Sequence, residues 1–378
     1  MKIILTSTIP LSLNHFCKGW FRELERSGYE VLAVSSPGRD LDEIEEREGA
    51  RTIAVPMHRQ IAPLKDLKGL WSLVKIFRKE RPRMVHSFTP KAGLLSMMAA
   101  WITRVPVRVH TFTGLVFPSS SGLKRRLLMT TDRLTCLFAT HVIPEGEGVK
   151  TDLQRYRITH KPLDVLGHGN VRGIDLKYFD PMDPEVKDKA AALRSEDRFT
   201  FLFVGRLVGD KGVNELVASF KKLNGEQPAA KLVLVGWEAD ADPLDPETDD
   251  EIRRNASIEY VGYQEDVRPW LLASDVLVLP SYREGFPNVV LEAGAMGLPS
   301  LVTDVNGSNE IIVDGKNGRI IPPRDPEQLY ESMKEMMLGE ERLGEMRRHA
   351  RKMVAERYEQ LYVRRCQMEY YREVLKGV

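Results

Sequence analysis

The sequence predicts an α/β protein made of two successive domains, each with a parallel β-sheet whose strands alternate with helices. Three observations lead to this prediction. Short runs rich in β-branched residues alternate with longer stretches whose apolar residues recur at helical spacing. The alternation begins near the N-terminus, and it begins again after a segment rich in proline and charge. The 378 residues are enough for two or three domains with buried cores.

The first domain is expected to cover residues 1–172. Its predicted strands are residues 2–7, 29–35, 51–55, 84–87, 107–111 and 141–144. Its predicted helices are residues 16–27, 67–78, 91–102 and 123–138. Because strand and helix alternate, the strands are expected to run parallel and to be joined by crossover helices.

The second domain is expected over residues 199–357, after a connection at residues 173–198. Its predicted strands are residues 199–204, 231–235, 258–261, 276–279 and 300–303, and its predicted helices are residues 213–223, 267–273, 289–295 and 328–338. Residues 237–251, with an Asp-Ala-Asp triplet at 240–242, are expected to form a solvated, mobile loop. A further helical pattern runs over residues 347–371. Since ligands of such sheets bind beyond the carboxyl ends of the strands, a cleft between the domains is the expected place for chemistry.

The composition is that of an ordinary soluble globular protein, with 42% hydrophobic and 29% charged residues. This excludes collagen, disordered tails and disulfide scaffolds. The cysteines, Cys17, Cys136 and Cys366, are odd in number and far apart, so neither a disulfide framework nor a zinc cluster is expected. Free thiols suit a reducing cytosol. The N-terminus lacks the pattern of a signal peptide, and no apolar run is long enough to span a bilayer.

The formal net charge of +1 hides a strong asymmetry along the chain. Residues 1–180 carry 28 basic and 18 acidic residues, a balance of +10, and residues 181–378 carry 27 basic and 36 acidic residues, a balance of −9. Residues 51–135 alone hold 16 basic and 3 acidic residues, a balance of +13. Such asymmetry indicates a polyanionic partner on the basic side, although solvated surfaces are the simpler alternative.

The sharpest motif is Gly205-Arg206-Leu207-Val208-Gly209-Asp210-Lys211-Gly212, which lies between a predicted strand and a predicted helix. Glycines permit close approach of the backbone to a ligand, and a helix start offers N–H groups and a positive dipole end. Arg206 and Lys211 add two positive charges, so the segment suits a diphosphate. A glycine-rich turn with two surface cations is an equally simple structural interpretation. The residue order is not that of a P-loop.

The second motif runs from Glu284 to Glu292, after the predicted strand at 276–279. Pro287 and Asn288 predict a helix entry, whose first N–H groups would be open to a phosphate. Glu292 lies one to two turns into that helix within an apolar run, where a carboxylate needs partners such as ribose hydroxyls. Glu284 could accept hydrogen bonds from sugar hydroxyls. A capping carboxylate and a surface glutamate are the structural alternatives.

Together the two motifs resemble family 4 of the glycosyltransferases, which are retaining enzymes of the GT-B fold that use nucleotide sugars. Residues 302–310 and 314–318 are also similar to this family, and the resemblance covers essentially the whole chain. It implies two Rossmann-like domains facing across a cleft, with the C-terminal helix at 358–378 crossing back to the first domain. It also implies a nucleotide diphosphate sugar donor, with UDP the expected nucleotide.

The resemblance also implies roles for individual residues. Arg206 and Lys211 would bind the donor diphosphate, Glu284 the transferred sugar and Glu292 the ribose. The full implied donor site is Gly205, Arg206, Lys211, Glu284, Gly285, Phe286, Pro287, Asn288, Val289 and Glu292. Because basic groups neutralise the diphosphate, neither a metal ion nor a cofactor is expected.

In the first domain, residues 85–95 and 109–114 resemble a subgroup that extends lipid-linked oligosaccharides at the inner face of the bacterial membrane. The implied acceptor is a lipid-diphosphate-linked saccharide in capsule, O-antigen or glycan precursor synthesis. His110 matches the family histidine that contacts donor sugar or phosphate, so it joins Arg206, Lys211 and Glu284 as an expected catalytic residue. A satisfied core histidine is its structural alternative.

The basic segment then has a candidate partner, the anionic surface of a membrane. The predicted helix at 67–81 carries five Lys and Arg residues opposite its apolar face, and Lys124, Arg125 and Arg126 begin another helix. Basic groups beside exposed apolar side chains suit reversible attachment to anionic lipid. Lys91, at a helix start, could instead meet the acceptor diphosphate. Most of the apolar residues on these helices are expected to belong to the domain core.

The sequence therefore predicts a retaining glycosyltransferase that is cytoplasmic and peripheral on the inner face of the cell membrane, with no nucleic-acid partner. A non-catalytic nucleotide-sugar-binding subunit of a membrane assembly is one alternative, and a family 4 transferase with a soluble acceptor is another. A dinucleotide-dependent oxidoreductase is disfavoured because the glycine fingerprint of that class is missing.

Overall fold

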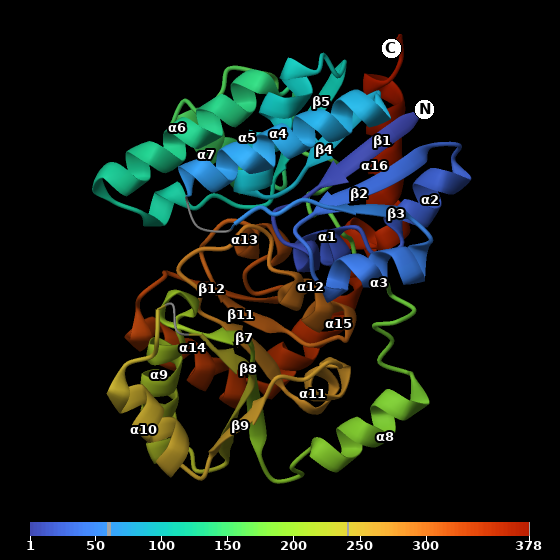
Figure 1. The fold of residues 1–378 in the computed structure, drawn as a ribbon. Helices are drawn as coiled ribbons and strands as arrows, with labels where there is room; N and C mark the ends of the chain where they lie inside the picture. The colour runs from blue at the N-terminus through green and yellow to red at the C-terminus, as the bar shows by residue number, and fades with distance from the viewer. Residues whose placement is uncertain (59–61, 240–241, 378) are drawn as a thin grey trace. The chain divides into compact units, whose positions relative to one another are not determined.

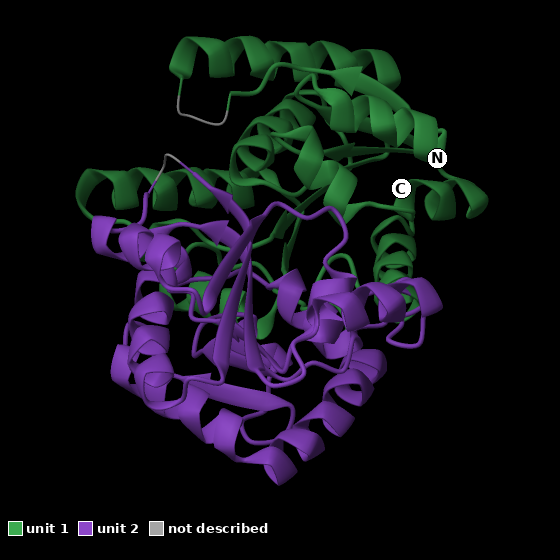
Figure 2. Ribbon diagram, turned by 90° about the horizontal axis from the view of Figure 1, so that it is seen from below, with its two compact units in different colours: residues 1–173, 361–378 green, residues 174–360 purple. Residues whose placement is uncertain are grey.

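The computed structural model describes residues 1–58, 62–239 and 242–377. Contacts between residues divide the chain into two units, shown in Figure 2. The first unit comprises Met1–Gly173 and Leu361–Val378, and the second comprises Ile174–Gln360. Residues 174–198, expected to be a connection, are instead part of the second unit and contain a helix, α8 (Pro184–Leu193). This helix packs against α11 (Arg268–Ala273) of the same unit.

The first unit contains a six-stranded parallel sheet with the strand order β3-β2-β1-β4-β5-β6. The strands are β1 (Lys2–Thr6), β2 (Glu30–Ser35), β3 (Arg51–Ala54), β4 (Met84–Ser87), β5 (Val107–Phe112) and β6 (His141–Pro144). The helices are α1 (Pro10–Phe16), α2 (Trp20–Arg26), α3 (Arg39–Glu48), α4 (Pro63–Glu80), α5 (Pro90–Ile102), α6 (Gly122–Phe138) and α7 (Glu147–Arg155). The order reverses between β1 and β4, which is where such sheets bind ligands.

Two layers of helices cover this sheet, one on each face (Figure 1). Alternate residues of β1 pack against opposite layers of helices. Ile4 packs against α4 and α5, while Ile3 and Leu5 pack against α1, α2 and α16 (Gln360–Val374). Burial on both faces is typical of parallel sheets. The C-terminal helix α16 therefore completes the core of the first unit, where Tyr371 is 1% exposed.

The predicted helix at 16–27 is interrupted, and α1 and α2 are separate. Gly19 lies between them with φ at 77°, and a Cβ there would lie 2.6 Å from Nη2 of Arg364 on α16. Only glycine suits a position that combines a left-handed backbone with such close packing. The helices α3 and α7 were not predicted, because short charged helices with only two or three buried residues give weak periodicity.

The second unit repeats the architecture, with the parallel strand order β12-β11-β10-β7-β8-β9. Its strands are β7 (Phe199–Leu207), β8 (Ala230–Glu238), β9 (Ile258–Gly262), β10 (Val276–Leu279), β11 (Ser300–Thr303) and β12 (Gly318–Ile321). Its remaining helices are α9 (Val213–Glu226), α10 (Pro246–Arg254), α12 (Asn288–Ala295), α13 (Ser308–Ile311), α14 (Pro326–Leu338) and α15 (Glu340–Tyr358). The order reverses between β10 and β7, so this pair marks the expected ligand position of the unit.

Four differences from the sequence prediction concern this unit. The strand β7 continues to Leu207, so Gly205 and Arg206 belong to a strand rather than to a turn. The loop expected at 237–251 contains the start of α10, and of its Asp-Ala-Asp triplet, Asp240 and Ala241 lie outside the described residues. The strand β12 was not predicted. The helical pattern at 347–371 is split between α15 and α16 at Glu359, where the backbone leaves the helical conformation with φ at −56° and ψ at 135°.

Candidate active site

The first part of the candidate site is the turn between β7 and α9. Arg206 lies near the end of β7, and Lys211 ends a short 3₁₀ turn at Gly209–Lys211. Gly212 follows with φ at 69°, and a Cβ there would lie 2.1 Å from the carbonyl oxygen of Pro280, just beyond β10. Glycine at this position therefore lets the turn pack directly against the end of the neighbouring strand.

The second part is the loop between β10 and α12. Phe286 is 5% exposed, and its ring lies 5.4 Å from that of Tyr358, which fixes the loop on the core of the unit. Pro287 precedes the first residue of α12, Asn288, as the sequence predicts. A Cβ on Gly307 would lie 2.4 Å from the carbonyl oxygen of Gly285, so a third loop packs closely on this one.

The fold brings the two motifs together at the point where the strand order reverses. Nζ of Lys211 lies 2.5 Å from Oε1 of Glu284, although the residues are 73 positions apart. Both side chains are mostly buried, with 19% and 12% exposed. The cation expected to bind the diphosphate and the carboxylate expected to bind the sugar are thus direct neighbours. In this structure their charges neutralise each other, which the sequence did not indicate.

A second ion-pair group surrounds Asp210. One of its carboxylate oxygens accepts a hydrogen bond from Nη2 of Arg283 at 2.9 Å, and the other lies 3.8 Å from Nη2 of Arg206. Neither Asp210 nor Arg283 was predicted as a site residue. The sequence could have pointed to both residues, because Asp210 directly precedes Lys211 and Arg283 directly precedes Glu284. Around the turn and the loop, Lys211 thus pairs with Glu284, while Asp210 lies between Arg206 and Arg283.

Glu292 lies in the second turn of α12, between the buried residues Leu291 and Ala293. Its own side chain is partly exposed. The helix therefore anchors its apolar face in the core, while Glu292 itself is only partly buried. Val289, beside the helix start, is also partly exposed.

His110 lies near the carboxyl end of β5 in the first unit and is 1% exposed. Its Nδ1 lies 2.8 Å from Oγ of Ser87 on the adjacent strand β4. Burial lowers the pKa of His110 to about 3, so the imidazole is neutral at physiological pH. A Cβ on Gly93 of α5 would lie 2.4 Å from Cε1 of His110, so this glycine makes room for the ring.

The basic residues singled out in the first unit have different surroundings. Lys91, at the start of α5, is not a free cation: its Nζ lies 2.8 Å from Oδ1 of Asp66 on α4. Lys124 and Arg126, at the start of α6, are exposed. Arg125 is partly buried, and its guanidinium lies 5.2 Å from the ring centre of Tyr156.

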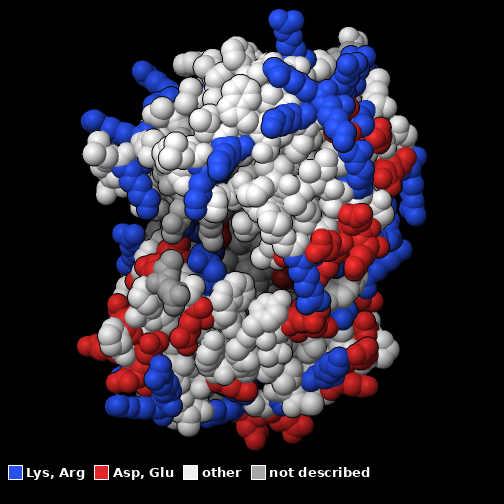
Figure 3. All heavy atoms as spheres, in the orientation of Figure 1, with Lys and Arg blue, Asp and Glu red and all other residues white. Residues whose placement is uncertain are grey.

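Five apolar side chains in the first halves of α4 and α6 are exposed, namely Leu64, Leu67, Trp71, Leu123 and Leu127. Leu64 and Leu123 are each 82% exposed. On α4, the residues Leu70, Val74 and Phe77 are buried as expected, but Leu67 and Trp71 do not join them in the core. Lys and Arg side chains stand among uncharged surface on the face drawn in Figure 3.

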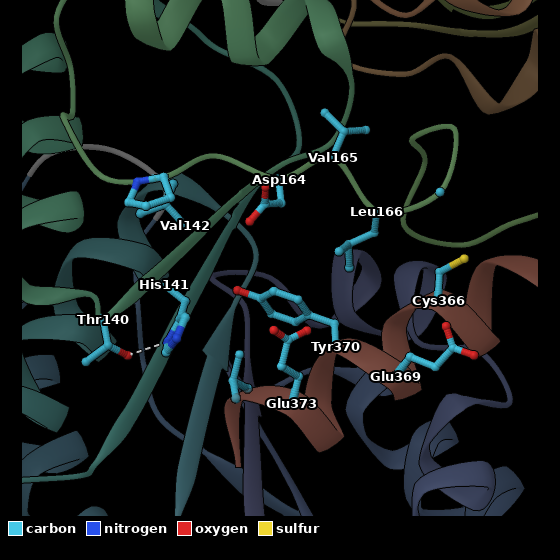
Figure 4. Close-up of a pocket in the computed structure, with 13 residues that line it drawn as sticks. Thr140, His141, Val142, Asp164, Val165, Leu166, Cys366, Glu369, Tyr370 and Glu373 are labelled. Atoms are coloured by element: carbon cyan, nitrogen blue, oxygen red, sulfur yellow. Dashed lines mark hydrogen bonds between the residues drawn. The ribbon is translucent and has the colours of Figure 1, made fainter. Parts of the chain in front are cut away.

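A cavity of about 720 Å³ in the first unit contains none of the predicted site residues (Figure 4). It lies between β6, residues 162–167 and α16, and Asp164, Glu369 and Glu373 give it an acidic lining. His141, the first residue of β6, contributes to the wall, and its Nδ1 is 2.8 Å from Oγ1 of Thr140. This is the amino end of the strand, opposite to the end where such sheets bind ligands.

Two kinds of feature are absent from the described ranges. No group of three or more His, Cys, Asp or Glu side chains there is arranged to hold a metal ion. Among the helices of the described part of the chain, none combines the length and the apolar character needed to cross a membrane.

Comparison with known proteins gives matches over both units. Residues 14–169 match the family described as glycosyl transferase 4-like domain, and residues 185–353 match glycosyl transferases group 1. The capsular polysaccharide biosynthesis glycosyltransferase CapM of Staphylococcus aureus is 31% identical over 358 residues, covering 94% of this chain and 92% of that protein.

Two further comparisons concern an enzyme with a named substrate and a solved structure. The UDP-Gal:α-D-GlcNAc-diphosphoundecaprenol α-1,3-galactosyltransferase of Escherichia coli is 30% identical, covering 74% of this chain and 72% of that enzyme. The crystal structure of Anabaena HepE in complex with UDP matches with a TM-score of 0.79 and 17% identity, covering 99% of this chain and 100% of HepE.

Proposed function

We propose that this chain, which belongs to the glycosyltransferases with 4-like and group 1 domains, transfers a sugar from a UDP-sugar donor. The proposed acceptor is a lipid-diphosphate-linked saccharide. We further propose that the anomeric configuration is retained, and that the product serves capsule, O-antigen or glycan precursor synthesis. The observation that carries the proposal is the contact between Lys211 and Glu284. It joins a cation for the leaving diphosphate to a carboxylate for the transferred sugar.

The donor diphosphate would bind beside Arg206 and Lys211, on the turn after β7, and beside the start of α12, which follows the neighbouring strand β10. As the bond to the sugar breaks, negative charge grows on the leaving phosphate, and fixed cations and helix N–H groups stabilise that charge. Lys211 would exchange its contact with Glu284 for one with the phosphate. The released Glu284 carboxylate could then accept hydrogen bonds from sugar hydroxyls.

The residues further from the reacting bond would hold the two ends of the donor. Glu292, one turn along α12, would accept hydrogen bonds from the ribose hydroxyls. His110 would contribute a neutral imidazole to the sugar or phosphate, because its low pKa keeps it uncharged. UDP is favoured as the nucleotide because the E. coli relative is named for UDP-Gal and the HepE structure contains UDP.

The proposals for the acceptor and the location rest on the names of relatives and on exposed side chains of the first unit. The names of relatives, including the E. coli enzyme, describe acceptors linked to diphosphoundecaprenol, which is a membrane lipid. Exposed apolar side chains beside exposed Lys65, Lys68, Lys124 and Arg126 suit shallow insertion into an anionic bilayer. The helices α4 and α6 both begin at the edge where the strands end, so lipid contact would lie on the same edge as His110. We propose attachment at the cytoplasmic face.

The transfer reaction can be tested directly. Nucleoside diphosphates and their sugars are screened by thermal shift, and the sugars that stabilise the protein are then offered with membrane extracts. We expect UDP to stabilise the protein, and Lys211→Ala to lower turnover at least ~100-fold, as for loss of one preorganised stabilising group. Lys222→Ala is the matched control, because this lysine pairs with Glu327 on the surface of the same unit.

Three results would contradict the proposal in different ways. Near-normal turnover of Lys211→Ala would contradict the proposal that Lys211 stabilises the leaving diphosphate. Donor binding without transfer to any acceptor would favour a non-catalytic binding subunit. Transfer to free saccharides but not to lipid-linked ones would favour a soluble acceptor.

Membrane attachment can be tested with vesicles. We expect the protein to sediment with vesicles containing phosphatidylglycerol, less so in high salt, and little with phosphatidylcholine alone. Replacing Leu64 and Leu123 with serine should weaken sedimentation, whereas Leu338→Ser, on an exposed leucine of the second unit, should not. Equal binding by all variants, or no binding at low salt, would contradict the attachment.

A further inference from the structure

Asp210 is an acidic residue in the middle of a site proposed to bind an anion. Its Oδ2 accepts a hydrogen bond from Arg283. Its Oδ1 is buried and, among the described residues, has no hydrogen-bond partner, although Nη2 of Arg206 lies 3.8 Å away. A buried carboxylate oxygen is normally hydrogen-bonded, so an oxygen left without such a bond calls for an explanation.

The backbone around Asp210 is held firmly in place. Its N–H donates to Oδ2 of Asp242 at 2.6 Å, and its carbonyl oxygen accepts from the N–H of Tyr282 at 3.0 Å. These two hydrogen bonds anchor the backbone from which the Asp210 side chain projects beside the arginines. Any diphosphate that contacts Arg206 must share that guanidinium with Asp210, at a separation where two negative charges repel strongly in a partly buried site.

This repulsion differs between the substrate and the product of the proposed reaction. In a nucleotide sugar both phosphates are esterified or bridged, so the diphosphate carries two negative charges. Transfer breaks the bond between the sugar and the outer phosphate oxygen, and that phosphate then keeps an additional ionisable group. The second pKa of a terminal phosphate is near 6, so at neutral pH the product carries almost one more negative charge.

We propose that Asp210 is a specificity-determining residue that weakens binding of the product nucleoside diphosphate more than binding of the donor, and so promotes product release. Arg283 is then a third cation of the diphosphate site, held in place by its hydrogen bond to Asp210. The inference rests on the proposed function, because it requires a diphosphate at Arg206. The inference goes beyond the proposed function because it assigns the difference in affinity between product and donor to one carboxylate.

The test compares affinities of the full-length chain for UDP and UDP-glucose at neutral pH by titration calorimetry. Asp210→Asn keeps the shape of the side chain and an oxygen for Arg283 but removes the charge. We expect this variant to bind UDP on the order of tenfold more tightly, and UDP-glucose by a smaller factor. The dissociation constant of UDP should therefore fall relative to that of UDP-glucose, and inhibition of transfer by added UDP should become stronger.

Two control variants separate charge from structure. Asp210→Glu keeps the charge and should keep the wild-type ratio if it folds. Asp250→Asn removes the same charge from an exposed ion pair on α10 and should also leave the ratio unchanged. Arg283→Gln should weaken the binding of both ligands, because it removes a cation.

The outcomes separate this inference from the proposed function. An unchanged or reversed ratio in Asp210→Asn, with UDP still bound, overturns the inference and leaves the function intact. Failure of the wild-type chain to bind any nucleoside diphosphate overturns both. If Asp210→Asn does not fold, the ratio in Asp210→Ser decides the question by the same criterion.

Discussion

Replacing Gly93 by alanine tests whether the position of His110 matters for transfer. The added methyl would lie 2.4 Å from Cε1, 2.8 Å from Nδ1 and 3.1 Å from Nε2 of the imidazole. Carbon atoms in contact normally lie about 3.5–4.0 Å apart, so the ring must move by about 1 Å. A shift of that size would disturb the contact between Nδ1 and the hydroxyl of Ser87, which are 2.8 Å apart in the native structure.

Two effects of different size are expected from Gly93→Ala. Overpacking of a well-filled site costs about 1–3 kcal/mol, which lowers the melting temperature of a unit of this size by several degrees. Displacement of a positioning group by about 1 Å lowers turnover by about 100-fold. Turnover with purified donor and acceptor is measured below the melting temperature, where the variant is folded.

The control for this prediction is Gly225→Ala. Gly225 lies in α9, and outside that helix no atom stands within 4 Å of the place a Cβ would take, so alanine should be neutral or slightly stabilising there. Normal turnover of Gly93→Ala, together with an unchanged melting temperature, would refute the packing argument, because it would mean that the added methyl does not displace the imidazole. A loss of stability with normal turnover would leave the packing argument intact but remove His110 from the site.

The remaining predictions concern the donor site, the pH dependence of folding and a buried ion-pair centre. Glu292→Gln should raise the KM for the donor several-fold with little change in kcat, because ribose contacts are equally strong in the ground and transition states; a loss confined to kcat would contradict this. Burial lowers the pKa of both His86 and His110 to about 3, so the unfolded chain takes up protons below pH 6.5 while the folded chain does not. Each histidine therefore destabilises the fold by about 2 kcal/mol on acidification from pH 6.5 to 5. Burial raises the pKa of Asp132 to about 7, so on acidification this carboxyl takes up a proton in the folded chain before it does so in the unfolded chain, which stabilises the fold. Thermal melts of Asp132→Asn, which lacks this stabilisation, should therefore show a steeper loss of stability towards pH 5 than wild type. Asp275 is 6% exposed and accepts bonds from Arg194, Arg347 and the N–H of Thr200, so Asp275→Ala should lower the free energy of unfolding of the second unit by about 3 kcal/mol, measured by denaturant titration.

Much of the fold could be predicted because its signals are local. The strands β4, β6, β10 and β11 have the predicted bounds, since apolar runs between turn residues identify buried parallel strands. The break at Gly19 was not visible, because it depends on the approach of Arg364 from the C-terminal helix. Short helices such as α10 were missed because mostly charged sequences resemble loops.

The candidate site could be predicted in part for the same reason. Arg206, Lys211, Glu284 and Glu292 stand in motifs with a recognisable order, and the order in the sequence is enough to name them. Their pairing is not local. Whether Lys211 is free or neutralised by Glu284 depends on β7 and β10 being neighbours in the sheet, which residues 73 positions apart do not reveal.

The sequence by itself thus determined the alternation of strands and helices, the two motifs and the charge asymmetry, because each depends on neighbouring residues or on counting. The tertiary structure alone decided which charges meet and which side chains are buried. It placed Asp210 between two arginines, put His110 in a space that only Gly93 leaves open, and left Leu64 and Leu123 exposed beside lysines and arginines. These are consequences of strand order and packing, which bring distant parts of the chain into contact.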